Sequence, residues 1–251
     1  MTELIGKLGR NDLRLIRRDN FLIFMFFFVL AIGVLLRFGL PWLNTYLAEN
    51  QVLPNETVRS SLADFYPLLV AFMALFQGSL ITGTIFGFML LDEKDDNTIK
   101  ALLVTPIPMN QYLFYRVGLP TVLAFAFILI LIFFINQALI PFWQLIPIAI
   151  GAALTSPIAS LFYAIFAENK VQGFAYGKFV SIAGWIILLG WFVSEPWQWL
   201  FGLFPPFLIS KAYWMALEGN PWWGLALLAG VIFQIGVLLI MARWFHKVAH
   251  Q

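Results

Sequence analysis

The charged side chains that could do chemistry are few in this chain, and five of them stand together as the run "DEKDD", residues 92–96. Acidic clusters at a helix end can hold a divalent metal for phosphate chemistry. The same acids suit the start of a helix, because carboxylates cap the first backbone N–H groups and favour the positive end of the helix dipole. We favour the second interpretation and expect a helix to start at about Asp95, Asp96 or Asn97.

The residues required by intramembrane enzymes are absent or wrongly placed. His246 and His250 stand at i and i+4 near the C-terminus, with no carboxylate beside them. A zinc peptidase needs a glutamate with such a pair, and a serine peptidase needs a histidine base that no apolar run contains. Cysteine and the G-x-x-x-x-G-K-[ST] nucleotide loop are both absent. We therefore expect no catalytic residue, metal or cofactor on this chain, which leaves an intramembrane enzyme as an unsupported alternative.

Composition indicates a membrane protein. Hydrophobic residues make up 61% of the 251 positions and charged residues 11%, which is about half the charged share of a soluble domain. A helix that crosses the roughly 30 Å hydrocarbon core needs about 20 apolar residues. We therefore predict an all-α membrane protein with a single transmembrane domain over residues 1–251. Its six predicted spans cover residues 21–40, 67–91, 117–135, 145–167, 173–193 and 222–242.

The basic residues predict the orientation, because lysine and arginine stay on the cytoplasmic side. They gather before span one, between spans two and three, after span four and after span six, whereas Arg37, Arg59 and Lys211 are expected on or toward the other side. We therefore expect a multi-pass protein of the inner (plasma) membrane with both termini in the cytoplasm.

Two further segments are expected at the membrane surfaces. Residues 1–20 place leucine and isoleucine on one side of a helix and basic residues opposite, which predicts an amphipathic interfacial helix. Residues 194–221 are rich in Trp and Phe but are interrupted by Pro196, Pro205 and Pro206. This pattern predicts broken outer helices between spans five and six that enter the outer leaflet and return. An aromatic belt at the interface is the simpler alternative.

The spans hold few polar side chains. No span has an acid at its centre, and Arg37 and Lys178 lie near span ends, from which they can reach the surface. A proton-coupled carrier is therefore disfavoured. Hydrogen bonds between helices are the first interpretation of the uncharged polar residues. Four of them are our candidates for lining a transport pathway: Gln77, Thr82, Thr84 and Asn136.

The cytoplasmic segment 92–116 is predicted to contain a short helix across the membrane surface. The stretch "NTIKALLVT" gives about two turns, and Pro106 ends them because the residue before a proline leaves the helical region. Leu102 and Leu103 lie on one side of this helix, in a face too small for a core but suited to a groove on another protein. A second helical piece, "MNQYLFYRV", leads back into span three.

Here the chain resembles the membrane subunits of type-2 ABC exporters. Their shared region has a Glu, a Gly-Thr, a short Leu-Leu helix, a Thr-Pro and a Glu-Tyr-Leu before the next span. The matching residues are Glu93, Thr98, Leu102, Leu103, Thr105, Pro106, Tyr112 and Leu113. The departures are Asn97 for Gly, Pro108 for Ser, Gln111 for Glu and Arg116 for Lys.

The resemblance implies a half-transporter that pairs with a second permease copy or a paralogue and docks a separate ABC ATPase subunit. ATP and Mg would then bind to that ATPase, and 98–105 would be the cytoplasmic coupling helix, with Glu93, Thr98, Leu102, Leu103, Thr105, Pro106 and Tyr112 in ATPase coupling. The chain looks most like small bacterial drug-efflux permeases, including fluoroquinolone exporters, and this implies outward movement of an amphipathic drug or lipid-like cargo by alternating access. The lipid bilayer is the other expected partner, and no nucleic acid is expected. A membrane scaffold or immunity protein that binds a cytoplasmic partner without transport is the alternative.

Overall fold

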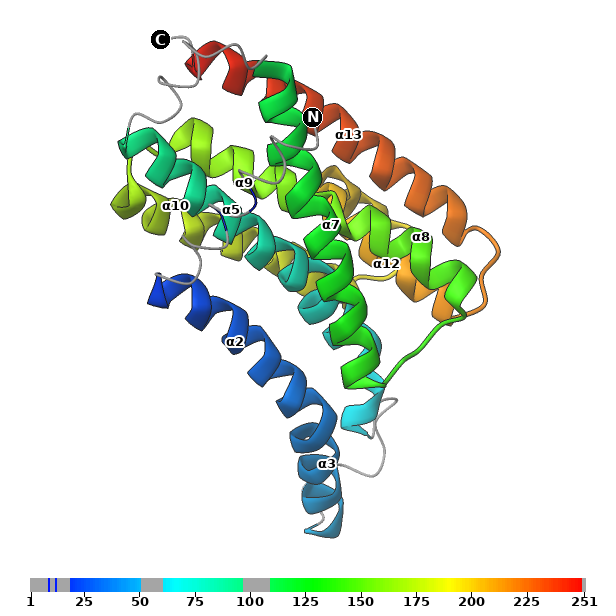
Figure 1. Cartoon of the computed structure of the whole chain (residues 1–251). Helices are drawn as coiled ribbons and strands as arrows, with labels where there is room; N and C mark the ends of the chain where they lie inside the picture. Colours follow the sequence, from blue (N-terminus) through cyan, green and yellow to red (C-terminus); the bar gives the residue numbers. More distant parts are fainter. Residues whose placement is uncertain (1–8, 10–11, 13–18, 51–60, 97–108, 250–251) are drawn as a thin grey trace.

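The computed structural model describes residues 9, 12, 19–50, 61–96 and 109–249, and every regular element among them is helical (Figure 1). The interfacial helix expected over 1–20 lies almost entirely outside these residues, as does the coupling helix expected over 98–105. The figure shows the last turns of α13 (Trp223–Ala249) and the first turns of α7 (Met109–Ile135) at the same end of the helix bundle. We call this the terminal end and the opposite one the far end.

Six helical stretches in the described part are long and apolar enough to cross a membrane, which confirms the predicted spans and the all-α class. Each is longer than its apolar run at one or both ends, because polar residues in the terminal turns remain helical. The stretches are Asn20–Leu47, Leu62–Asp95, Gln111–Ile135, Phe142–Phe166, Lys170–Trp191 and Trp223–Phe245.

Span one continues past its predicted end. It consists of α2 (Asn20–Val34), the π-helical turn η1 (Leu35–Gly39) and α3 (Leu40–Glu49). The connection predicted over 41–66 therefore begins too early. In a regular helix Pro41 would lack a hydrogen bond and clash with the preceding turn. The wider η1 turn, in which the Leu40 N–H bonds to the Leu35 carbonyl oxygen, accommodates the proline and lets the helix continue.

Arg37 of η1, near the end of span one, contacts span three. Its guanidinium donates to the carbonyl oxygen of Phe134 and lies 5.7 Å from the centre of the Phe134 ring. Phe134 stands in the last turn of α7 (Met109–Ile135), where backbone carbonyls have no helical partner. The Tyr66 hydroxyl donates to the Leu36 carbonyl oxygen at 3.0 Å. These contacts join spans one, two and three near the far end.

Span two is the most buried of the six. Its η2 turn begins with a capping box between Ser61 and Asp64. The helix start expected at Asp95 or Asp96 is wrong, because the last helix of the span continues through Asp95 and Asp96 is its C-cap. Side-chain contacts hold this final turn, including a hydrogen bond of 3.1 Å from Lys94 Nζ to the Ala167 carbonyl oxygen. The elements are η2 (Leu62–Phe65), α4 (Tyr66–Val70), η3 (Ala71–Gln77) and α5 (Gly78–Asp95).

Span three is the unbroken α7, which confirms that "MNQYLFYRV" leads into it. Span four divides at Leu154 into α8 (Phe142–Ala153) and α9 (Thr155–Phe166). Span five divides at Gly184 into α10 (Lys170–Ala183) and α11 (Trp185–Trp191). The backbone at Gly184 approaches span two so closely that a Cβ there would lie 2.4 Å from the Phe76 ring. Span six is α13 (Trp223–Ala249).

The segment between spans five and six contains the broken helices that its prolines predict. They are η4 (Trp197–Leu203) and α12 (Pro205–Leu217). Most of α12 is buried against other helices, and the Trp214 indole donates to the Pro67 carbonyl oxygen at 3.1 Å. Lys211 forms an ion pair with Glu195 and a hydrogen bond with the Gln198 amide oxygen. The segment is thus a packed part of the bundle.

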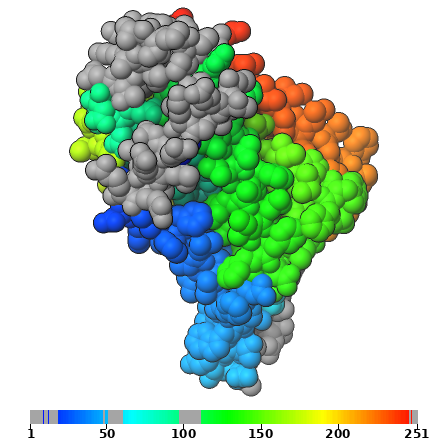
Figure 2. All heavy atoms as spheres, in the orientation of Figure 1, coloured from blue at the N-terminus to red at the C-terminus, as the bar shows by residue number. Residues whose placement is uncertain are grey.

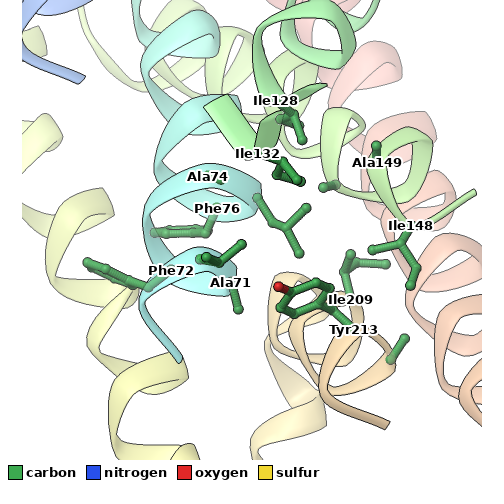
Figure 3. Close-up of a cluster of buried hydrophobic side chains, with 14 of the residues drawn as sticks. Ala71, Phe72, Ala74, Phe76, Ile128, Ile132, Ile148, Ala149, Ile209 and Tyr213 are labelled. Atoms are coloured by element: carbon green, nitrogen blue, oxygen red, sulfur yellow. The ribbon is translucent and has the colours of Figure 1, made fainter. Parts of the chain in front are cut away.

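The main hydrophobic core joins η3, α7, α8 and α12 (Figure 3). Tyr213 of α12 points its ring into this cluster, close to Ile209 of the same helix, and its hydroxyl donates to the Ala138 carbonyl oxygen at 2.5 Å. Burial raises the pKa of the Tyr213 phenol. The labelled residues are Ala71, Phe72, Ala74, Phe76, Ile128, Ile132, Ile148, Ala149, Ile209 and Tyr213.

The small residues of spans two and four face each other within this chain. A Cβ at Gly83 of α5 would lie 2.3 Å from the Ser156 carbonyl oxygen of α9. A Cβ at Gly87 would lie 2.6 Å from the Tyr163 ring. The two backbones approach so closely only because these positions carry no side chain. Gly83 and Gly87 are therefore used in the internal packing of α5 on α9.

Candidate functional site

A buried group of ionisable side chains lies at the terminal end, and we call it the Arg116 cluster. It comprises Asp12, Glu93, Tyr112, Tyr115 and Arg116. Asp12 precedes α2, and Glu93 is in the last turns of α5. The other three stand at i, i+3 and i+4 near the start of α7, a spacing that places them on one face of that helix. Three segments distant in the sequence therefore meet here.

Arg116 is at the centre of the cluster. Its guanidinium forms an ion pair with Glu93 and lies 3.2 Å from Oδ2 of Asp12. The Tyr112 hydroxyl donates to Oε2 of Glu93 at 2.5 Å, and the Tyr115 hydroxyl donates to Oδ2 of Asp12 at 2.7 Å. Arg116 is 1% exposed. Because each carboxylate has both a cationic and a phenolic partner, the cost of burying these charges is partly offset.

The cluster brackets the segment that the sequence predicts to be the coupling helix. Glu93 precedes residues 97–108 and Tyr112 follows them, so the structure brings two of the predicted coupling residues into direct contact. The other predicted coupling residues lie outside the described part of the chain: Thr98, Leu102, Leu103, Thr105 and Pro106. The cluster therefore holds together the described flanks of that segment, the end of α5 and the start of α7.

A second ionic contact at the terminal end joins spans one, two and five. Lys170, the first residue of α10, lies 2.8 Å from Asp19 Oδ2 and 3.0 Å from Asp92 Oδ1. Asp19 is also the N-cap of α2 and accepts from the backbone N–H of Phe21 and Leu22. Burial alone would raise the pKa of Asp19, but the bonds from Lys170 and Leu22 hold it below its ordinary value. This carboxylate is therefore ionised at neutral pH.

A cavity of about 710 Å³, which we call the aromatic cavity, is lined by α2, the η3–α5 helix and α10, and by Tyr163 from α9. Four aromatic rings form one side of it, with Phe88 4.9 Å from Phe174 and 5.4 Å from Tyr163 between ring centres, and Phe21 4.7 Å from Phe174. The polar side chains on its wall are Gln77, Thr84, Tyr163, Lys178 and Ser181. The cavity therefore suits a largely apolar, aromatic molecule with a few polar groups.

The four pathway candidates do not all lie together. Gln77 and Thr84 line the aromatic cavity, and the Thr84 hydroxyl lies 3.3 Å from that of Tyr163. Thr82 is on the wall of a different cavity of about 440 Å³, and its hydroxyl donates to the Gly78 carbonyl oxygen at 2.9 Å. Asn136 follows the last residue of α7 with φ of 54° and lines neither of these two cavities.

The described residues contain no group of three or more His, Asp or Glu side chains placed to hold a metal ion. His246 falls in the last turns of α13, and His250 lies beyond the described residues. The Arg116 cluster is suited to holding helices together. The aromatic cavity is suited to binding a largely apolar molecule.

A family model described as fluoroquinolones export permease protein Rv2686c-like matches residues 12–242. The match begins at Asp12 of the Arg116 cluster, includes the first five spans and extends through most of the sixth. The chain belongs to this family. The resemblance to small bacterial drug-efflux permeases is thereby confirmed.

Among the curated relatives of this Rv2686c-like permease are the fluoroquinolones export permease proteins MT2760 and Rv2686c, from two strains of Mycobacterium tuberculosis. Each is 28% identical to the chain over 246 residues, which is 96% of this chain and 93% of the relative. No solved structure matches the chain.

Sequence reasoning did not identify Asp12, Tyr115 or Arg116 of this permease as site residues. Arg116 was visible as a charge where an apolar span begins, and its spacing from Tyr112 places both on one helix face. Asp12 gives no such signal, because its partners are more than a hundred positions away. Only the tertiary structure brings these groups together.

Proposed function

We propose that this permease is the membrane-spanning subunit of an ATP-driven exporter for amphipathic, fluoroquinolone-like drugs. The observation that carries the proposal is the aromatic cavity between α2, α5 and α10 in a chain of the Rv2686c-like permease family. Its volume of about 710 Å³ falls within the range of drug-sized sites. Relatives that share 28% identity over nearly the whole chain are named for fluoroquinolone export.

Energy for export would come from a separate ATPase subunit, which would bind ATP and Mg and dock against residues 98–105. The Arg116 cluster supports this proposal, because it ties both flanks of that segment to the chain that precedes α2. A displacement imposed on the segment would therefore reach α5, α7 and the start of span one together. This gives the ATPase a mechanical connection to the helices that form the cavity wall.

A second copy or a paralogue would complete the transporter. Spans one and five support this, since only 22% of the apolar window of each is buried within the chain. Figures 1 and 2 show α2 at the edge of the bundle, with α3 projecting past the other helices. With the positive-inside orientation in the inner membrane, both termini and the Arg116 cluster would face the cytoplasm and the ATPase.

The test is drug transport in inside-out vesicles that contain this chain together with an ABC ATPase subunit with which it co-purifies. We expect uptake of the fluorescent drug norfloxacin that requires ATP and is blocked by vanadate. Vesicles with the ATPase alone are the control. Absence of ATP-dependent uptake, with a stable complex of the two proteins, would contradict export and favour the scaffold alternative.

A further inference from the structure

Lys178 lines the aromatic cavity but takes part in none of the ion pairs found among the described residues. It lies on α10 and is the one side chain on the described cavity wall with a full charge. Lys170, eight residues earlier, marks the terminal end through its contacts with Asp19 and Asp92. Eight residues of helix rise about 12 Å, so the Lys178 backbone lies about two turns inside the span, and its side chain is exposed at the cavity wall. A cation at this depth is costly unless it has an anionic partner or reaches water.

The described residues provide no anion for Lys178. The nearby carboxylates at the terminal end, Asp19 and Asp92, are both occupied by Lys170. Glu93 is occupied by Arg116 and Tyr112. The polar neighbours on the cavity wall are an amide and hydroxyl groups, all of them neutral at pH 7.

The rest of the wall defines the shape of a matching ligand. Phe21 and Phe174 contribute accessible rings to the wall, and the buried rings of Phe88 and Tyr163, each 2% exposed, pack against them with ring centres 4.7 to 5.8 Å apart. Flat aromatic molecules pack well on such a surface. The Lys178 ammonium on the same cavity wall can supply a strong, charge-assisted hydrogen-bond donor for an anion.

We propose that Lys178 recognises the carboxylate of the cargo, so that the cavity selects flat aromatic carboxylates. The inference rests on the proposed export function and names the substrate class of that same cavity. A fluoroquinolone fits this class, since it is a fused planar ring system with a carboxylate on one edge. The ring system lies against the aromatic side chains, and the carboxylate accepts hydrogen bonds from Nζ of Lys178.

The test compares norfloxacin with its methyl ester, which keeps the ring system and removes the anion. Binding of each is measured by fluorescence with the full chain in lipid nanodiscs. We expect the wild type to prefer the acid and Lys178→Met to weaken acid binding roughly tenfold or more. Ester binding should stay within about twofold, because the change removes only the contact with the anion. Lys178→Arg should keep most of the acid binding, since it retains a cationic donor.

Lys247→Met is the matched control, because it removes the same charge from an exposed position on α13. Equal binding of acid and ester by the wild type, or unchanged acid binding by Lys178→Met, would overturn the proposal and leave the export function standing. Loss of ester binding in Lys178→Met would also overturn it, because Lys178 would then maintain the shape of the cavity. If vesicles with the ATPase transport neither probe, the export function fails and this inference fails with it.

Discussion

The guanidinium of Arg116 and the carboxylate of Glu93 form an ion pair in which the two side chains are only 1% and 5% exposed. The pair joins the last turns of α5 to the first turns of α7. Removing one partner would leave the other charge buried without compensation, at a cost of about 3 to 5 kcal/mol. The first prediction below tests this contact, and the second concerns the segment between the two residues.

The first prediction concerns stability. We expect Arg116→Met to lower the free energy of unfolding by about 3 kcal/mol or more, measured by titration with a denaturing detergent. Glu93→Gln should also destabilise the protein, and the double variant should lose less than the two single losses together. Glu218→Gln, at an exposed C-cap, is the control. Additivity within about 0.5 kcal/mol would show that the two residues do not interact.

The second prediction concerns coupling through the segment between these residues. Leu102→Asp or Leu103→Asp should abolish the stimulation of ATP hydrolysis by drug, because a buried contact with the ATPase would receive a charge. Pro106→Ala should weaken it by releasing the end of the short helix. Membrane insertion should be unchanged, as judged by yield and gel filtration. Normal stimulation in all three variants would contradict a coupling role for 98–105.

The third prediction concerns the packing of α5 on α9. Gly83→Ala should destabilise the protein by about 1 to 3 kcal/mol, because its Cβ would lie 2.3 Å from a backbone oxygen that cannot move aside easily. Gly236→Ala in α13 is the matched control, since a Cβ there meets nothing within 4 Å. This control should be neutral or slightly stabilising. Equal effects of the two changes on the free energy of unfolding would disprove the close approach.

The fourth prediction concerns pH. The pKa of Asp19 is lower in the folded protein than its ordinary value, which is about 3.9 in an unfolded chain. The Asp19 carboxylate therefore stabilises the fold above this pH, and the contribution is lost as the pH falls through the folded pKa. Asp19→Asn keeps an N-cap acceptor and removes the charge. We expect the stability difference between wild type and variant to be largest near pH 7 and to shrink toward pH 3.

A difference that stays constant across this pH range would show that the Asp19 charge contributes nothing to folding. Asp64→Asn provides the comparison, because Asp64 is also a capping carboxylate but makes no ion pair among the described residues.

The features that follow local chemistry were predictable from the sequence. Apolar runs identified all six spans, and Pro196, Pro205 and Pro206 indicated the broken helices of η4 and α12. The length of span one was not predictable in this way, because a proline such as Pro41 normally marks a helix end. Only the π-helical turn before it, whose hydrogen bonds leave no pattern in the sequence, allows the helix to continue.

The Arg116 cluster illustrates a second limit of prediction from the sequence, which concerns contacts between distant segments. Glu93 and Tyr112 were found through a family pattern that lies within one short segment. Asp12 and Arg116 are 104 positions apart, and their contact depends on how α7 lies against the chain before α2. Lys178 is intermediate, since its charge was visible but its position on a cavity wall depends on the placement of α2 beside α5 and α10.

The continuity of α2 with α3 also affects how the first helix can sit in a bilayer. Its 28-residue apolar stretch rises about 42 Å, whereas the hydrocarbon core is about 30 Å thick. This positive hydrophobic mismatch can be relieved by tilt, or by leaving the α3 end outside the lipid. Little of the stretch is held by other helices, so changes of tilt disturb few contacts. Of the helices around the aromatic cavity, α2 is therefore a wall that can change its tilt while disturbing few contacts.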